Sequence, residues 1–129
     1  GYQFSDGVYE VTAIVKGVPI DFDLHMERLK RSCKEISIAL PMPINAMRIV
    51  MRELLRKNRM LGQDAVLYQQ ITRGVATRAH PFPSHTKPSF VMQVFPSRTP
   101  APKAYARGGK VITYPDIRWD QRHIKSVSL

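Results

Sequence analysis

Residues 8–36 read Val-Tyr-Glu-Val-Thr-Ala-Ile-Val-Lys-Gly-Val-Pro-Ile-Asp-Phe-Asp-Leu-His-Met-Glu-Arg-Leu-Lys-Arg-Ser-Cys-Lys-Glu-Ile, and this stretch decides the fold. Residues 8–15 are β-branched and apolar with one charge, which predicts a mostly buried strand. Lys16 and Gly17 form a turn signal. Residues 18–22 then return as a second strand, so the stretch opens with a β-hairpin.

An amphipathic helix is predicted directly after this hairpin. Asp23 stands where a helix N-cap is expected, since its carboxylate accepts hydrogen bonds from free N–H groups of the first turn. The buried stripe of the helix recurs at helical spacing, at Phe22, Met26, Leu29, Cys33 and Ile36. Pro41 and Pro43 end the helix, because proline has no N–H to donate.

The next apolar pattern predicts a second helix at residues 45–58. Its inner stripe consists of Met47, Val50, Met51 and Leu54. A row of arginines four residues apart, Arg48, Arg52 and Arg56, lines another face, and we interpret it as a solvated surface.

Residues 64–73 and 88–95 are predicted as strands, and residues 74–87 connect them. This connection is longer than a hairpin turn requires, and long ordered loops are usually functional. We therefore predict an α+β fold for a small domain at residues 1–97. A proline-containing interdomain linker follows at 98–108. Residues 109–129, with a strand at 110–114, are expected to begin a second domain.

Composition restricts the class of protein. The chain has 129 residues, 43% of them hydrophobic, which suits a folded domain rather than a disordered chain. No apolar run is long enough to cross a bilayer, and no secretion signal begins the chain. The single cysteine, Cys33, excludes an internal disulfide framework and favours a cytoplasmic location. No cysteine or histidine cluster has the spacing of a metal site.

The formal net charge of +10 taken alone would favour a nucleic-acid or acidic-membrane partner. The basic residues are spread along the chain, and no aromatic-basic signature of an RNA-binding sheet occurs. We therefore interpret the charge as a solvated basic surface and expect neither nucleic acid nor membrane as a partner.

Four segments together are highly specific, although each alone would be weak. They read Gly-Tyr-Gln-Phe-Ser-Asp-Gly-Val-Tyr-Glu at 1–10, His-Met-Glu-Arg-Leu at 25–29, Thr-Arg-Gly-Val-Ala-Thr-Arg-Ala-His at 72–80, and Asp-Ile-Arg-Trp at 116–119 with Ile-Lys-Ser at 124–126. In order and approximate spacing they resemble the class IV, fold-type-IV family of pyridoxal-phosphate enzymes, and most closely its D-amino-acid aminotransferases.

The resemblance implies a small N-terminal α/β sandwich-like domain followed by the start of a larger cofactor-binding domain. The family's chain begins before Gly1 and continues well past Leu129. The sequence therefore looks like an N-terminal fragment, which we expect to be inactive alone. The family's glutamate for the cofactor pyridine nitrogen falls beyond Leu129.

Lys125 is the residue on which the expected chemistry depends. From its apolar neighbours alone, it could be a strand-end lysine whose amine reaches water. The resemblance instead makes it the lysine that forms a Schiff base with pyridoxal 5′-phosphate. A partly desolvated amine loses its proton more readily, which suits that role. The sequence departs from the family pattern just before this lysine. The family commonly has Arg-Cys-Asp before Ile-Lys, whereas residues 121–123 here are Gln-Arg-His.

Further site residues follow from the resemblance. Arg28, otherwise a surface arginine, corresponds to the family's ligand of the cofactor phosphate, which a planar, permanently charged guanidinium suits. Arg118 corresponds to an arginine near the cofactor's phenolic oxygen. Tyr9 and Val11, which alternation places on one face of a strand, correspond to residues of the substrate pocket.

Arg78 and His80 lie in the long loop with one residue between them, and could simply be a basic, solvent-exposed loop tip. The resemblance implies that this pair reaches across from the second subunit of a homodimer to bind the substrate α-carboxylate. It also separates D-amino-acid aminotransferases from the rest of the family.

Three functions remain open from the sequence. The first is a transaminase that moves an amino group from a D-amino acid to a 2-oxo acid. The second keeps the fold but is a branched-chain aminotransferase or an aminodeoxychorismate lyase. The third is a non-catalytic basic module that binds nucleic acid or phosphate.

Overall fold

The computed structural model describes residues 5–97, 106–113 and 123–127. Residues 5–97 contain four strands and two helices in the order ββααββ. The strands are β1 (Gly7–Val15), β2 (Val18–Pro19), β3 (Ala65–Thr72) and β4 (Ser89–Pro96), and the helices are α1 (Phe22–Glu35) and α2 (Ile44–Lys57). The predicted α+β fold is confirmed.

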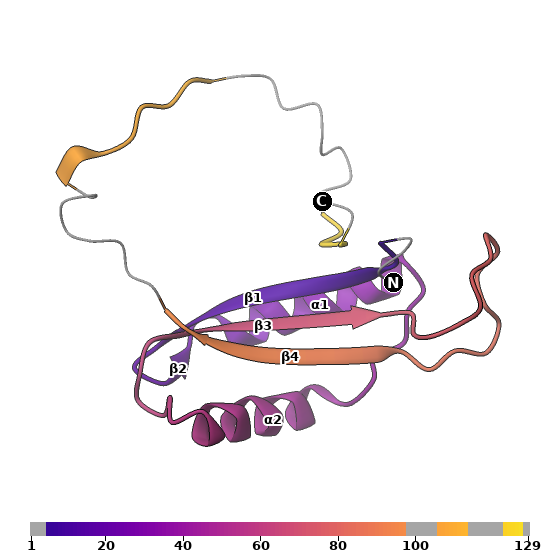
Figure 1. Cartoon of the computed structure of the whole chain (residues 1–129), viewed down its shortest axis with the longest axis horizontal. Helices are drawn as coiled ribbons and strands as arrows, with labels where there is room; N and C mark the ends of the chain where they lie inside the picture. Colours follow the sequence, from indigo (N-terminus) through magenta and orange to yellow (C-terminus); the bar gives the residue numbers. More distant parts are fainter. Residues whose placement is uncertain (1–4, 98–105, 114–122, 128–129) are drawn as a thin grey trace.

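The strands form one antiparallel sheet in the order β2-β1-β3-β4 (Figure 1). β1 and β3 pair along almost their whole length, with Val8 opposite Ile71 and Ile14 opposite Ala65. Because side chains alternate between the two faces of a strand, this register places Val8, Glu10, Thr12 and Ile14 on one face. Tyr9, Val11 and Ala13 lie on the other face.

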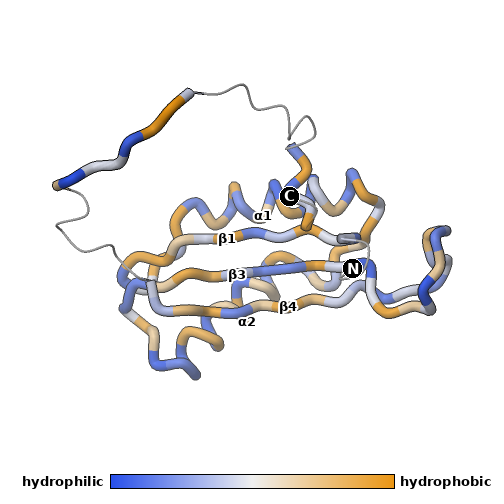
Figure 2. Tube along the Cα trace, turned by 45° about the horizontal axis from the view of Figure 1, so that its top comes forward, coloured by the Kyte–Doolittle hydropathy of each residue, from blue (hydrophilic) through white to orange (hydrophobic). Residues whose placement is uncertain are grey.

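The core lies between the sheet and the two helices. α1 packs against β1, and α2 packs against β4. Their stripes are buried as the sequence predicts at Phe22, Met26, Leu29 and Cys33 in α1 and at Met47 and Met51 in α2. The α1 tube in Figure 2 accordingly alternates between hydrophilic and hydrophobic residues. Both helices contribute to one core cluster with the same sheet face, so neither α1 nor α2 covers the face of Tyr9 and Val11.

Several details differ from the sequence predictions. In α2, Leu55 is buried, whereas the predicted Val50 and Leu54 are only half-buried. β1 is buried on alternate residues only, rather than mostly buried, because helices cover a single face of the sheet. The second hairpin strand contains only Val18 and Pro19, since the chain turns into α1 at Phe22. Asp23 is not the N-cap of α1. That position belongs to Asp21, which adopts a left-handed conformation with φ 48° and makes no side-chain capping bond.

The segment after the sheet is described only in part. Residues 98–105 of the predicted linker lie outside the described residues, so the expected domain division stays a prediction. Residues 110–113 of the predicted strand at 110–114 do not form a strand. Val111 and Ile112 are 91% and 90% exposed. A strand is stable only when its N–H and C=O groups pair with a neighbour, and within residues 106–113 none is paired in that way.

Two absences hold for the part of the chain that the structure describes. Its helices include none with the length and apolarity required to span a membrane. Among its histidine, cysteine, aspartate and glutamate side chains, no group of three or more could hold a metal ion.

Candidate active site

The segment that carries Lys125 pairs with the start of β1. Ser126 forms a bridge with Val8. The N–H of Tyr9 donates to the carbonyl oxygen of Lys125 at 3.0 Å, and the N–H of Val127 donates to that of Gly7 at 2.9 Å. This antiparallel pairing sets Lys125 opposite Tyr9, so both side chains lie on the sheet face opposite α1 and α2.

The ring of Tyr9 lies directly beside the Lys125 amine. The Lys125 Nζ is 4.2 Å from the ring centroid, a distance at which an ammonium is attracted by the ring face. The Tyr9 ring in turn stacks on the ring of Tyr68, with the two ring centroids 5.9 Å apart. The Tyr68 hydroxyl donates to Gln70 Oε1 at 2.8 Å. The amine therefore borders an aromatic surface formed by β1 and β3.

Two close contacts hold the Lys125 segment and the strand with which it pairs. The Lys125 N–H donates to the hydroxyl of Ser32 on α1 at 3.3 Å, and Ser32 is fully buried. Gly7 allows β3 to pass close to the start of β1, because a Cβ there would lie 2.7 Å from the carbonyl oxygen of Ile71. Lys125 is thus tied to both the sheet and the helix layer.

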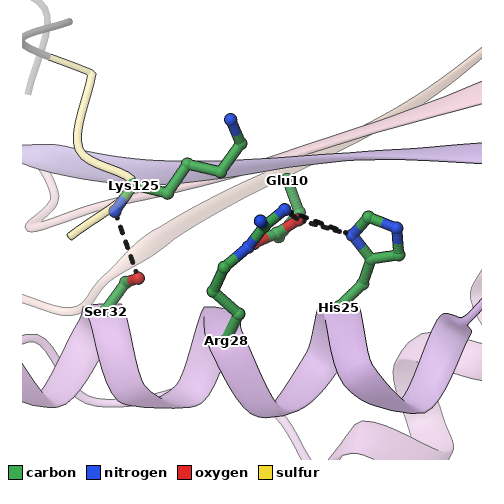
Figure 3. A network of polar contacts seen from close by, with 5 residues as sticks. All are labelled: Glu10, His25, Arg28, Ser32 and Lys125. Atoms are coloured by element: carbon green, nitrogen blue, oxygen red, sulfur yellow. Dashed lines mark hydrogen bonds and ion pairs between the residues drawn. The ribbon is translucent and has the colours of Figure 1, made fainter. Parts of the chain in front are cut away.

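A charged cluster connects β1 to α1 at the same edge of the sheet. Glu10 is 0% exposed, and its carboxylate accepts two hydrogen bonds from Arg28, from Nε at 2.6 Å and from Nη2 at 2.7 Å. His25 Nδ1 lies 2.7 Å from Glu10 Oε2. Figure 3 shows Arg28 and His25 extending from successive turns of α1 toward Glu10, and Lys125 approaching the same stretch of β1. A buried carboxylate requires such partners.

Two pKa shifts bear on the chemistry. The hydrogen bonds that Arg28 donates to Glu10, together with the charge of that carboxylate, raise the pKa of the Arg28 guanidinium, so Arg28 is a permanent cation. Burial raises the pKa of the Cys33 thiol to about 11. Because the thiolate is the nucleophilic form, Cys33 is excluded as a nucleophile near neutral pH.

The loop between β3 and β4 carries Arg78 and His80, both exposed. Figure 1 shows this loop extending past the end of the sheet, beyond the start of β1. The hydrogen bonds of the Lys125 segment described above join it to β1 and α1. Tyr9, Lys125 and Arg28 are thus gathered at one edge of the chain, whereas Arg78 and His80 lie on a projecting segment. Arg118 lies outside the described residues.

The base of this loop is held by Arg73. Its guanidinium makes two hydrogen bonds to the Asp6 carboxylate, at 2.5 and 2.9 Å. It also donates to the carbonyl oxygens of Ile36 and Ser37 at 2.8 and 3.0 Å. The ring of Phe82 lies over the Arg73 guanidinium, with 4.4 Å between the guanidinium carbon and the ring centroid. Arg73 therefore joins the loop to the start of β1 and to the end of α1.

Sequence reasoning assigned no role to Glu10, His25, Ser32 or Arg73. One signal could have found Glu10, because it alternates with Val8, Thr12 and Ile14 and so occupies a buried register. A carboxylate there needs a cation, and Arg28 falls on the helix that packs against this strand. Ser32 and Arg73 had no such signal, because their partners Lys125 and Asp6 are distant in sequence.

The chain matches the profile of a family described as amino-transferase class IV over residues 7–129. It is 38% identical to a D-alanine aminotransferase of Bacillus licheniformis over 129 residues, which cover 100% of this chain and 44% of that protein. It is 36% identical to a D-alanine aminotransferase of Staphylococcus haemolyticus, with 100% and 45% covered. The chain thus spans less than half the length of these curated relatives.

Solved structures share the fold at lower identity. The Escherichia coli branched-chain amino acid aminotransferase superposes with a TM-score of 0.65 at 20% identity, over 73% of this chain and 32% of that chain. A putative 4-amino-4-deoxychorismate lyase of Legionella pneumophila gives 0.65 at 15% identity, over 75% and 35%. A hypothetical aminotransferase of Mycobacterium tuberculosis, solved with alpha-ketoglutarate and PMP bound, gives 0.58 at 18% identity, over 71% and 30%.

Proposed function

This chain belongs to the class IV amino-transferase family, and from that premise we propose that the intact protein is a pyridoxal-phosphate-dependent transaminase that uses Lys125. The amino donor is a D-amino acid and the acceptor a 2-oxo acid. The observation that carries the proposal is the Lys125 Nζ lying 4.2 Å from the ring of Tyr9, on an open sheet face.

The residues present fit this cofactor. It combines an aldehyde, an aromatic ring and a phosphate, so its site needs an amine, a flat apolar surface and a fixed cation. Lys125 offers the amine, and Tyr9 with Tyr68 offers the aromatic surface. Arg28 offers the cation, with its side chain 41% exposed and its charge secured by Glu10. Tyr9 lies in the first half of β1. Lys125 and Arg28 contact this part of the strand, and Tyr68 stacks on Tyr9 from β3.

When bound, the cofactor supplies the aldehyde that joins to the lysine and the ring that takes up electrons released at the substrate α-carbon. Lys125 Nζ, released when the substrate amine takes its place, would then move a proton from that carbon to the carbon that carried the aldehyde. Tyr9 and Val11 border the substrate. Arg28 binds the phosphate, and Arg118 is proposed to lie near the phenolic oxygen.

Substrate selection is assigned to the loop. An arginine can bind a carboxylate with two parallel hydrogen bonds, so Arg78, helped by His80, is proposed to bind the α-carboxylate. Because this loop projects past the sheet, we propose that it serves the site of the second subunit in a homodimer. The D-amino-acid preference is supported by the 38% and 36% identity to D-alanine aminotransferases.

The second candidate keeps the fold but changes the reaction. A branched-chain aminotransferase and a lyase both superpose on this chain, at identities of 20% and 15%. Identities this low establish the fold alone. The pair Arg78 and His80 favours the D-specific reaction over both.

The test uses the absorbance of the cofactor bound to the intact protein. Adding D-alanine should remove the resting absorption band, and adding a 2-oxo acid should restore it. L-Leucine should leave the band unchanged. A response to L-leucine alone would establish the branched-chain alternative instead, and pyruvate release from aminodeoxychorismate would establish the lyase.

A further inference from the structure

Glu10 occupies an unusual position for a carboxylate. It lies on the core side of β1, opposite Gln69 of β3, and is 0% exposed. Taking a carboxylate out of water is costly unless it is paired and hydrogen-bonded. Both of its oxygens are used, since Oε1 accepts from Arg28 and Oε2 accepts from Arg28 and contacts His25. Such a group is held rigidly by its surroundings.

The two bonds to Glu10 fix the orientation of Arg28. A guanidinium is planar and has two edges that can bind an anion, one formed by Nε and Nη2 and the other by Nη1 and Nη2. Glu10 occupies the first edge. Nη1 takes part in none of the hydrogen bonds given for the described residues, and 41% of the side chain is exposed. Nη2 also lies 3.4 Å from His25 Nδ1, so the guanidinium is held in one orientation while part of it stays accessible.

His25 supports the same arrangement. A carboxylate paired with a guanidinium acts only as an acceptor, so the Nδ1 of His25 carries the hydrogen that this contact uses. The imidazole is held against Glu10 Oε2 from the side opposite Ser32, one turn of α1 before Arg28. It limits the freedom of the carboxylate to turn away from Arg28.

We propose that Glu10 is the positioning residue that aims Arg28 at the cofactor phosphate, an inference that rests on the function proposed above. The contribution of Glu10 is orientation rather than charge. Its negative charge alone would oppose a phosphate, so an electrostatic role would predict tighter phosphate binding once it is removed. Positioning predicts the opposite sign, because an unheld arginine must be ordered again each time the phosphate binds.

The experiment compares pyridoxal 5′-phosphate with pyridoxal, which lacks the phosphate, by titration of the intact protein freed of cofactor. Glu10→Gln keeps the size of the side chain but replaces one acceptor oxygen with an NH2 donor and removes the charge, so the two parallel bonds from Arg28 can no longer both form. The dissociation constant for pyridoxal 5′-phosphate should rise about 10-fold, comparable to the loss of a partner that orients a binding group. The constant for pyridoxal should stay unchanged.

Two controls make the result specific. Glu53→Gln removes an exposed carboxylate that also pairs with an arginine, Arg56, on α2, and it should change neither constant. In an Arg28→Ala background, Glu10→Gln should have no further effect on the ratio of the two constants, because Glu10 acts through Arg28.

The outcomes separate this inference from the function beneath it. Unchanged or tighter binding of pyridoxal 5′-phosphate in Glu10→Gln, or equal weakening of both ligands, overturns the positioning role. If Arg28→Ala also fails to weaken the phosphorylated ligand selectively, the phosphate assignment itself is wrong. If Glu10→Gln does not fold, Glu10→Asp serves instead. It withdraws the carboxylate by one methylene, and it should show the same selective loss. Wild-type affinity in Glu10→Asp would then overturn the role.

Discussion

The amine of Lys125 lies 4.2 Å from the ring centroid of Tyr9, and the backbones of these two residues are joined by a 3.0 Å hydrogen bond. Residues near opposite ends of the chain are thereby fixed face to face. The contact depends on β1 having a free edge at Gly7–Tyr9, because β2 pairs only with Ile14 and Val15. The short β2 thus leaves room for the Lys125 segment.

Lys125 should carry the cofactor in the intact protein. Borohydride reduction fixes a cofactor bound to an amine, so peptide mapping should find the pyridoxyl mass on Lys125. Lys110 is a suitable control, since it is also near the end of the chain but exposed, and Lys110→Ala should keep the label. A label on any other lysine would refute the assignment.

Arg78→Ala should raise the Michaelis constant for the amino donor about 10- to 100-fold. A hydrogen bond between charged groups contributes about 1.5–3 kcal/mol, and each 1.4 kcal/mol corresponds to about one decade. The cofactor spectrum should barely change, because this loop does not hold the ring. An unaltered Michaelis constant in steady-state kinetics would contradict the recognition role.

Mixing two defective variants tests whether Arg78 acts across a dimer. After subunit exchange, Arg78→Ala with Lys125→Ala should give heterodimers with one intact site, in which Lys125 of one subunit meets Arg78 of the other. Activity should then exceed that of Arg78→Ala alone. If the arginine serves its own subunit, no site is whole, and the mixture shows no gain.

Gly74→Ala should destabilise the protein more than Gly62→Ala. Both glycines have positive φ, 113° and 76°, which costs an L-residue about 1–2 kcal/mol. Only Gly74 adds a clash, since a Cβ there would lie very close to the carbonyl oxygen of Lys87. Urea unfolding of both variants measures the difference. Equal losses would show that the backbone at the base of the loop can shift freely.

Cys33 should make stability depend on alkaline pH. Its pKa is raised from 9.0 to about 11 in the folded protein. The folded state therefore keeps its proton between those values while the unfolded state releases it, and the free energy of unfolding should fall as pH rises from about 9 to 11. Cys33→Ala should lose this part of the pH dependence. An identical slope in both proteins, measured by urea unfolding, would exclude Cys33 as its source.

The sequence predicted features that depend on local periodicity. The stripe of α1 could be read from Phe22 to Cys33 because a helix repeats every 3.6 residues, and the shared face of Tyr9 and Val11 followed from strand alternation. Boundaries were less certain, as the N-cap at Asp21 shows. Both residues are aspartates with the same capping side chain, so composition does not separate them, and the helix begins directly after Asp21.

The resemblance of four short segments supplied the family, and the match over residues 7–129 agrees with it. The roles of Lys125, Arg28, Tyr9, Val11, Arg78, His80 and Arg118 remain predictions. The tertiary structure added the contacts that hold Lys125, Arg28 and Tyr9 in place. No local pattern pairs Lys125 with Ser32 or Arg73 with Asp6, because these contacts join segments far apart in sequence.

The sequence by itself determined which residues could face the core and which residues carry amine, guanidinium and aromatic chemistry. Only the tertiary structure decided that the buried Glu10 takes one edge of Arg28 and that Lys125 meets Tyr9 on the uncovered face. The reason is physical: side-chain periodicity is set by backbone geometry within each element, whereas the partner of a buried charge is set by which elements pack together.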